Sequence, residues 1–171
     1  AHLGEKNNAQ KTLLYIDVGG GSTELSLFRD NKLLQKESFN IGTIRLLQNQ
    51  VSKAHWQELA RFLKAISKKN DQVQLVGSGG NINKLFSLSK QKEGKPLTKA
   101  TLSSYYDSLS AMSIEERMHH YDLREDRADV MVPAISIFLN IMEHMKSNEI
   151  FVPKIGLADG IVRSIYYQES L

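Results

Sequence analysis

The sequence predicts an α/β fold in which a mixed five-stranded sheet carries helices on both faces and a helical insertion. Three runs of strand character follow one another at residues 12–18, 22–29 and 33–40. Two short apolar runs, at residues 73–76 and 150–152, are separated from these and from each other by segments of helical period. Strands and helices in this order are typical of one layered α/β domain.

The first three strands should form a meander, because Asp30 and Asn31 supply a tight turn between the second and the third. The helices follow from apolar residues at helical spacing. They are expected over residues 46–66 with a break near Ser52, 81–89, 99–112, a short segment after Ser113, 126–146 and 156–168. Ser113 with Glu116 resembles a capping box. Residues 126–146 are too apolar for a surface helix, so this helix should be central and buried.

The composition indicates an ordinary soluble domain. A chain of 171 residues with 41% hydrophobic and 24% charged residues can bury one sizeable core. Residues 1–11 are polar and lack a period, which predicts a disordered end or cut linker, so the domain should occupy residues 12–171. No apolar run approaches the length of about 18 residues that a membrane span needs, and no secretory signal is present. A cytoplasmic location without membrane contact is therefore expected.

Several classes of site are excluded by residue type. The chain has no cysteine, which rules out disulfides and thiolate metal sites, and its five histidines show no metal-ligand spacing. No nucleic-acid fold signature is present, so no nucleic-acid partner is expected. The net charge of +3 serves either solubility or the attraction of a polyanionic substrate.

The most informative segment, residues 17–24, has the sequence DVGGGSTE and lies in the turn between the first two strands. Three successive glycines allow positive φ and a close approach of the backbone to a ligand, and the N–H groups of such a turn bind anions. Ser22 and Thr23 add hydroxyl donors. Asp17 and Glu24 would repel phosphate unless a hard cation such as Mg²⁺ lay between them. This combination predicts phosphate chemistry.

A second glycine-rich turn, residues 77–80, precedes a helix whose N-terminal N–H groups would face an anion. It is either a phosphate site or a tight packing turn. Other motifs also leave two interpretations open. Asp159 either caps the last helix or faces the ligand, and Arg124, Arg127 and Asp129 either form an internal ion pair or contact substrate. The basic run of Lys84, Lys90, Lys92, Lys95 and Lys99 is either a solvated face or a polyphosphate track.

Together these motifs resemble the exopolyphosphatase and guanosine pentaphosphate phosphatase family, of the actin, Hsp70 and sugar-kinase superfamily. The resemblance is carried, in the family's order, by residues 17–24, 77–80, 127–134 and 156–162, with 42–46 after the meander. It implies a ribonuclease-H-like (actin-like ATPase) domain, the second of two that face one another across a cleft. The family's first phosphate loop and its general-base glutamate have no counterpart here, so a first domain is expected elsewhere in the protein.

The resemblance also implies the roles of individual residues. Asp17 and Glu24 match the catalytic carboxylates that hold Mg²⁺ and orient the attacking water. The matching phosphate-binding residues are Gly19, Gly20, Gly21, Ser22 and Thr23 in the first loop and Gly79 and Gly80 in the second. Asn81 replaces the threonine that members often carry, and Ala134 a common glycine.

The implied function is release of the terminal phosphate of inorganic polyphosphate or guanosine pentaphosphate by a two-domain hydrolase, with the isolated domain nearly inactive. The sequence does not decide between these two substrates. It also leaves open whether the protein forms a homodimer. Two rival functions are an ATP-binding domain of the actin or sugar-kinase type and a non-catalytic sensor of phosphorylated nucleotides. The paired carboxylates Asp17 and Glu24 argue against a sensor, which does not need them beside a phosphate loop.

Overall fold

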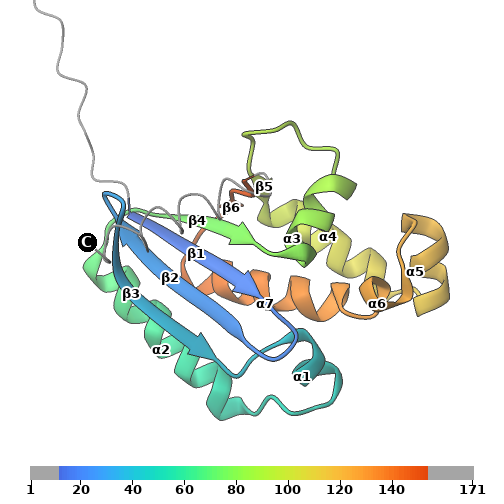
Figure 1. Ribbon diagram of the computed structural model, residues 1–171, viewed down its shortest axis with the longest axis horizontal. Helices are drawn as coiled ribbons and strands as arrows, with labels where there is room; N and C mark the ends of the chain where they lie inside the picture. Colours follow the sequence, from blue (N-terminus) through green and yellow to red (C-terminus); the bar gives the residue numbers. More distant parts are fainter. Residues whose placement is uncertain (1–11, 154–171) are drawn as a thin grey trace, which may run out of the picture.

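The computed structural model describes residues 12–153 and contains a mixed sheet with helices packed against it (Figure 1). Its strands are β1 (Thr12–Val18), β2 (Thr23–Arg29), β3 (Lys32–Phe39) and β4 (Val73–Ser78), in the order β3-β2-β1-β4. The three N-terminal strands are antiparallel neighbours, whereas β4 pairs parallel to β1. Asp30 and Asn31 adopt positive φ angles of 51° and 63° between β2 and β3, which confirms the predicted meander and its turn.

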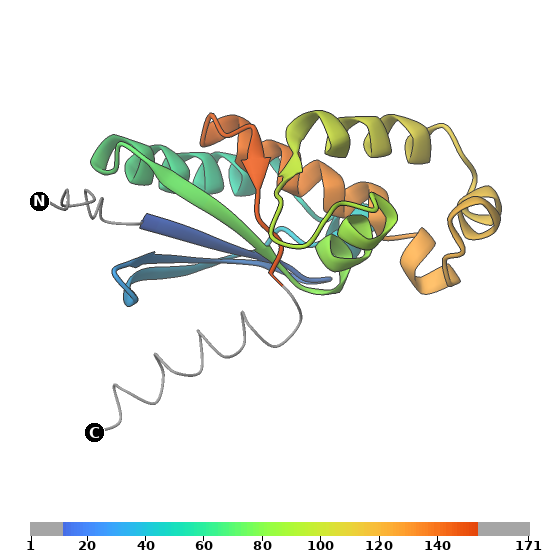
Figure 2. The same cartoon turned by 90° about the horizontal axis from the view of Figure 1, so that it is seen from above.

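Helices α2, α4 and α7 lie on one side of this sheet (Figure 2). The described helices are α1 (Thr43–Leu47), α2 (Lys53–Lys69), α3 (Gly80–Leu88), α4 (Lys99–Ser110), α5 (Ile114–Tyr121), α6 (Glu125–Ala128) and α7 (Met131–His144). Ser113 and Glu116 form the predicted capping box at the start of α5. Among residues 12–153, no helix is long and apolar enough to cross a membrane.

The main core lies between the sheet and these helices. Leu14, Ile16 and Leu25 point into it from the sheet and are fully buried, as is Phe138 of α7. Because side chains alternate along a strand, the residues between them face the opposite side of the sheet. There Tyr15, Phe28 and Val76 form a smaller apolar cluster. Asp17 and Glu24 belong to this second face by the same alternation.

The fifth strand is shorter than the sequence predicts. Phe151 extends the sheet by a single parallel bridge to Val76, with hydrogen bonds from Gly77 N to Phe151 O (2.8 Å) and from Phe151 N to Leu75 O (2.9 Å). Ile150 belongs instead to β6 (Glu149–Ile150), which pairs with β5 (Leu97–Thr98) in a separate two-stranded sheet. The helix expected over residues 156–168, and with it Asp159, lies outside the described residues.

The buried helix predicted over residues 126–146 is divided into α6 and α7. Pro133 explains the division. It has no N–H to donate to the carbonyl of Asp129, and its ring would clash with that carbonyl in a continuous helix. The break falls at Asp129 and Val130, which leaves Pro133 in the first turn of α7, where a proline is tolerated.

Candidate functional site

The two carboxylates singled out in the sequence lie opposite one another at one end of the sheet. Asp17, the next-to-last residue of β1, pairs in register with Glu24 of β2 and with Ser78 of β4. Neighbouring strands therefore bring the three side chains to the same face, with Asp17 in the middle. Asp17 is exposed and Glu24 is half-buried. The glycine loop between β1 and β2 begins directly beyond this pair.

The carbonyl groups of the three loop glycines are directed at the start of α1. Gly19, Gly20 and Gly21 each accept a hydrogen bond from a residue of that helix. These bonds run from Thr43 N to Gly19 O (3.0 Å), from Ile44 N to Gly20 O (2.9 Å) and from Arg45 Nε to Gly21 O (2.7 Å). The N-terminal donors of α1 are thus used by the loop, so this helix start is not itself an anion site.

The amide groups of the loop point the other way. In a trans peptide the C=O and the following N–H lie on opposite sides. The N–H groups of Gly20, Gly21 and Ser22 are therefore turned away from α1, and none has a hydrogen-bond partner within residues 12–153. Successive backbone amides without internal partners can form an anion-binding concavity. The arrangement suits a phosphate group beside Asp17 and Glu24.

The reason for the three glycines differs from the sequence-based expectation. None of Gly19, Gly20 and Gly21 has a positive φ. Close packing requires glycine instead, because a Cβ on Gly20 would lie 3.1 Å from Ile44 Cγ1 and one on Gly42 would lie 2.3 Å from Gly20 O. The loop and α1 approach one another too closely for side chains, whereas a Cβ on Gly21 would meet nothing within 4 Å.

Glu24 is held in one orientation by two hydroxyl groups. Its Oε1 accepts hydrogen bonds from Ser22 Oγ at 2.9 Å and from Ser38 Oγ at 2.6 Å. Ser22 therefore acts on Glu24 through its side chain, and its backbone N–H remains available for a ligand. Ser38 was not among the residues singled out from the sequence, because its role depends on the pairing of β3 with β2.

The hydroxyl of Thr23 is not directed at a ligand, although the loop sequence suggests it as a donor. The residue is fully buried, and its hydroxyl donates a hydrogen bond of 2.6 Å to Ile41 O. A hydroxyl in this position ties β2 to the segment before α1 and cannot reach a ligand. The strand alternation was the available signal, because Thr23 has the same parity as the core residues Leu25 and Leu27.

The second glycine turn lies directly beside Asp17. Gly77 and Ser78 still belong to β4, and Gly79 caps α3 with φ 96° and ψ 167°, a conformation essentially restricted to glycine. A Cβ on Gly79 would lie 2.5 Å from Asp17 Oδ1, and one on Gly80 would lie 2.4 Å from an Arg127 Nη atom. Both glycines thus let a charged side chain lie against the backbone.

Among residues 12–153, Arg127 forms no internal ion pair, which was one of the two interpretations of its motif. Its Nη1 donates to Asn81 Oδ1 at 3.0 Å, and Asn81 Nδ2 in turn donates to Val18 O at 3.3 Å. This chain of hydrogen bonds links α6, α3 and the end of β1. The ion pair that does form here joins Arg124 to Asp126, and both are exposed. Asn81 therefore has a structural role.

The charges near the site are simple. Burial raises the pKa of the Tyr15 phenol above its ordinary value, so this neighbour of Asp17 on the same face stays neutral. The guanidinium of Arg127 adds a positive charge at the second glycine turn, next to Gly80. The basic run is divided, because Lys90, Lys92 and Lys95 are exposed between α3 and β5, whereas Lys99 pairs with Glu143 of α7.

The donor set fits a magnesium ion that is completed by substrate. Mg²⁺ is usually bound by one or two carboxylates together with phosphate oxygens and water, whereas a metal site built only from protein needs more ligands. Asp17 and Glu24 supply two carboxylates, and no group of three or more acidic or histidine side chains that could hold a metal occurs within residues 12–153.

Comparison with known families identifies the family of the chain. The model of the Ppx/GppA phosphatase family matches residues 4–169. The chain belongs to the Ppx/GppA phosphatase family. The match includes both glycine turns and the segment that carries Arg127. No curated protein sequence matches the chain significantly.

Solved structures of Ppx/GppA proteins share the fold. The Ppx/GppA phosphatase of Aquifex aeolicus is 26% identical with a TM-score of 0.71, and the match covers 92% of this chain and 58% of that one. An exopolyphosphatase from Cytophaga hutchinsonii is 21% identical with a TM-score of 0.70, covering 94% and 58%. These likenesses confirm the predicted actin-like α/β fold. The chain spans less than two thirds of the length of either protein.

Proposed function

We propose that this chain is the second ribonuclease-H-like domain of a two-domain phosphatase that releases the terminal phosphate of inorganic polyphosphate or guanosine pentaphosphate. The observation that supports it most is the orientation of the glycine loop. Its carbonyls are bound to α1, its amides are turned outward, and Asp17 and Glu24 lie beside them. Family membership and the partial coverage of the Aquifex protein agree with this proposal.

In the proposed mechanism this chain binds and orients the reacting phosphate. The N–H groups of Gly20, Gly21 and Ser22 would bind its equatorial oxygens, where charge must be stabilised in the transition state. Asp17 and Glu24 would hold Mg²⁺, which supplies further neutralisation of that charge. Ser22 and Ser38 fix Glu24, and Arg127 brings a cation to the second turn.

The reaction itself is an in-line displacement. The oxygen of a water molecule forms a bond to the terminal phosphorus while the bridging oxygen leaves with the electron pair of the broken bond. The proton of the water passes to a base, which we place in the first domain, because Asp17 and Glu24 would be engaged with Mg²⁺ and no other described residue of the loop has a side chain that could accept it. The isolated 171-residue chain should therefore be nearly inactive.

The test compares Glu24→Gln with Glu37→Gln in the complete protein. Glu37 is exposed on β3, away from the loop, so Glu37→Gln is a control for the same chemical change. Phosphate release from polyphosphate, guanosine pentaphosphate and ATP is measured with Mg²⁺, together with ligand binding by calorimetry. The Glu24 variant should lose about 100-fold or more in kcat, while Glu37→Gln stays unchanged.

Two results would contradict the proposal. If the protein hydrolysed ATP but neither polyphosphate nor guanosine pentaphosphate, the kinase-like alternative would be favoured. Binding without turnover in the unsubstituted protein, unaffected by Glu24→Gln, would favour a sensor.

A further inference from the structure

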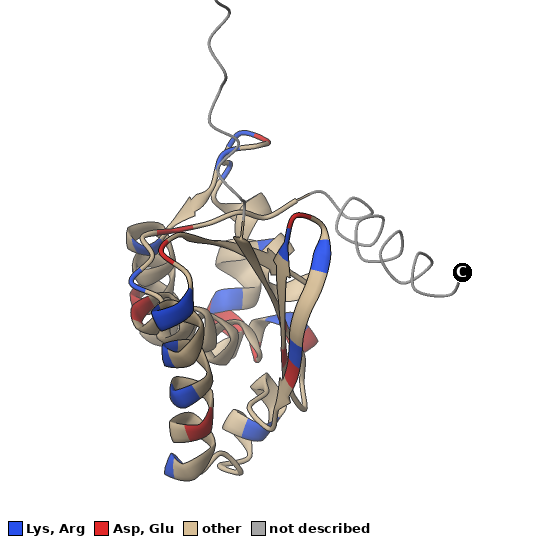
Figure 3. Cartoon of the chain, turned by 90° about the vertical axis from the view of Figure 1, so that its left-hand side faces the viewer, with Lys and Arg blue, Asp and Glu red and all other residues tan. Residues whose placement is uncertain are grey.

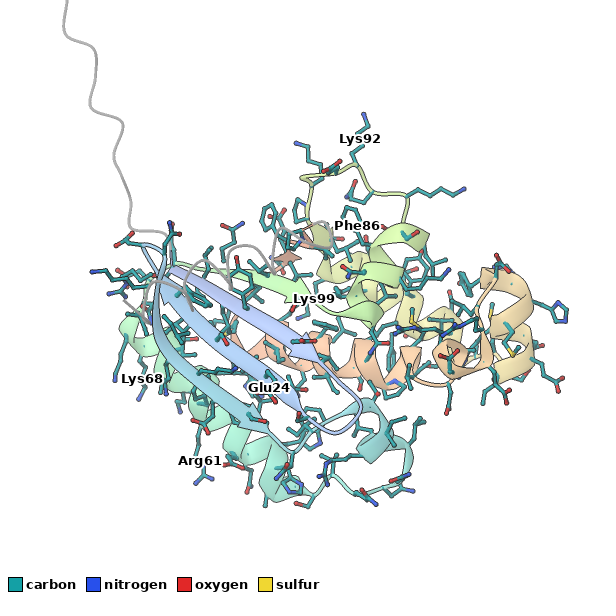
Figure 4. All side chains as sticks on the ribbon, viewed as in Figure 1. Glu24, Arg61, Lys68, Phe86, Lys92 and Lys99 are labelled. Atoms are coloured by element: carbon teal, nitrogen blue, oxygen red, sulfur yellow. The ribbon has the colours of Figure 1, made fainter. Side chains whose placement is uncertain are left out.

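A groove of about 920 Å³ lies between α2 and the end of α7, and it has no part in the site described above. It opens on the helical side of the sheet, whereas Asp17 and Glu24 belong to the opposite face. Figure 4 shows Arg61 and Lys68 projecting outward from α2. The groove is lined by Gln57, Ala60, Arg61, Lys64, Ser67, Lys68, Glu143, His144 and Lys146.

The lining concentrates positive charge. Four cationic side chains, Arg61, Lys64, Lys68 and Lys146, face a single carboxylate, Glu143, which leaves an excess of three. The whole chain has a net charge of +3, so the charges outside the groove balance. Glu143 is moreover hydrogen-bonded to Lys99, which lowers the pKa of its carboxyl group and already offsets its charge. In Figure 3, most of the coloured segments along α2 are the blue of Lys and Arg.

Helix electrostatics explain only part of this concentration. Lys68 in the last turn of α2 and Lys146 just after α7 complement the negative ends of those helices. Arg61 and Lys64, however, stand one turn apart in the middle of α2, where like charges at such spacing repel one another. An anion in the groove would remove this repulsion.

The lining also indicates which polyanion fits. Arg61, Lys64 and Lys68 form a row along one helix face that extends over about 10 Å at the α-helical rise. A linear chain of phosphates can follow such a row. Single-stranded nucleic acids are usually held by aromatic side chains that stack on the bases, and no Phe, Tyr or Trp lines the groove. The features favour phosphate without bases.

We propose that the groove between α2 and α7 binds a distal stretch of the inorganic polyphosphate chain whose terminal phosphate occupies the glycine loop. This inference rests on the proposed function and narrows its substrate to polyphosphate. Arg127 lies in α6, just before α7, and the 14 residues of α7 extend over about 20 Å from there to the groove, so the two sites are separated by about the length of this helix. Only chains long enough to span this distance bind both, and they gain affinity because the second contact is intramolecular.

The test uses two double variants of the complete protein, both in the Glu24→Gln background to prevent turnover. Lys64→Ala/Lys68→Ala removes two groove charges. Lys53→Ala/Lys69→Ala removes two exposed charges from the same helix outside the lining. Affinity for fluorescent long-chain polyphosphate is measured by anisotropy over a range of salt concentrations. The groove variant should bind about tenfold more weakly, and its salt slope should fall by about 1.4, whereas the control should match the parent.

Further measurements separate the groove from the catalytic site. With Glu24 restored, both variants should hydrolyse tripolyphosphate at the parent rate, because so short a chain cannot reach the groove. Equal loss of long-chain affinity in both double variants would overturn the proposal. It would also be overturned if single-stranded RNA of matched charge competed for the groove as well as polyphosphate. A protein that binds polyphosphate in the groove but releases no phosphate would refute the proposed function while leaving the groove assignment intact.

Discussion

Ser38 lies directly opposite Glu24 in the register of β3 and β2, and its hydroxyl donates a hydrogen bond of 2.6 Å to Glu24 Oε1. Together with Ser22 it leaves the Glu24 carboxylate little freedom to rotate. A group that orients a metal-binding carboxylate typically changes metal affinity or activity by about 10- to 100-fold when it is removed. Ser38 is therefore the residue through which β3 contributes to the site.

We expect Ser38→Ala to weaken Mg²⁺ binding and to lower kcat by about tenfold each, with little change in stability. Calorimetric titration with Mg²⁺ in the presence of inorganic phosphate and steady-state phosphate release measure the two effects. Ser26→Ala is the matched control, because Ser26 is the next β2 residue on the face of Glu24. If both variants bind Mg²⁺ like the parent, Glu24 does not need Ser38 for its orientation.

Thr23→Val should reduce stability and spare substrate binding. The substitution keeps the shape of the side chain but leaves the Ile41 carbonyl without its hydroxyl donor, at a cost of about 1–3 kcal/mol. Urea denaturation gives the loss, and Thr23→Ser should retain most of the stability. A raised KM with unchanged stability would instead show that the Thr23 hydroxyl contacts the substrate.

Gly79→Ala should abolish most of the activity, whereas Gly94→Ala should affect only stability. Both residues have positive φ angles, 96° and 77°, so each substitution introduces backbone strain of about 1–3 kcal/mol. The new Cβ at position 79 would lie 2.5 Å from Asp17 Oδ1 and would displace that side chain. A new Cβ at position 94 would meet nothing within 4 Å. Thermal unfolding and phosphate release are compared for both variants. Equal activity losses would mean that strain alone, and not Asp17, is responsible.

The ion pair between Lys99 and Glu143 should make a small, pH-dependent contribution to the free energy of unfolding. The Lys99 hydrogen bond, and then its charge, lower the pKa of the Glu143 carboxyl below its ordinary value of 4.5. A lowered folded-state pKa stabilises the protein above pH 4.5, and the contribution disappears as the pH falls through the folded-state pKa. Glu143→Gln should therefore flatten the acid limb of a plot of unfolding free energy against pH. Glu58→Gln on α2 serves as control, and identical acid limbs for Glu143→Gln and the parent would contradict the expectation.

Much of the fold could be predicted because its signals are local. Short apolar or alternating runs located β1 to β4. The Asp30–Asn31 turn and the Ser113–Glu116 cap likewise depend only on neighbouring residues. The apolar period did not predict the division of the buried helix, because the apolar spacing continues through the break. Pro133 was the available signal, since a proline is tolerated only in the first turn of a helix.

The site could be predicted less completely, since the roles of its residues depend on distant partners. The order of acids, glycines and hydroxyls identified the loop, but not that its carbonyls bind α1 or that Thr23 is buried. Ser38, Arg127 and Asn81 acquire their contacts only when β3, α6 and α3 come together around the end of β1.

The sequence by itself determined the order of most strands and helices and the chemistry of residues 17–24, because period, turn residues and side-chain type are properties of short segments. Only the tertiary structure decided which groups of that loop face a ligand, how Glu24 is oriented, and that Arg61, Lys64 and Lys146 share one groove. These relationships join residues far apart in the chain, and they arise from strand register and helix packing, which no local pattern specifies.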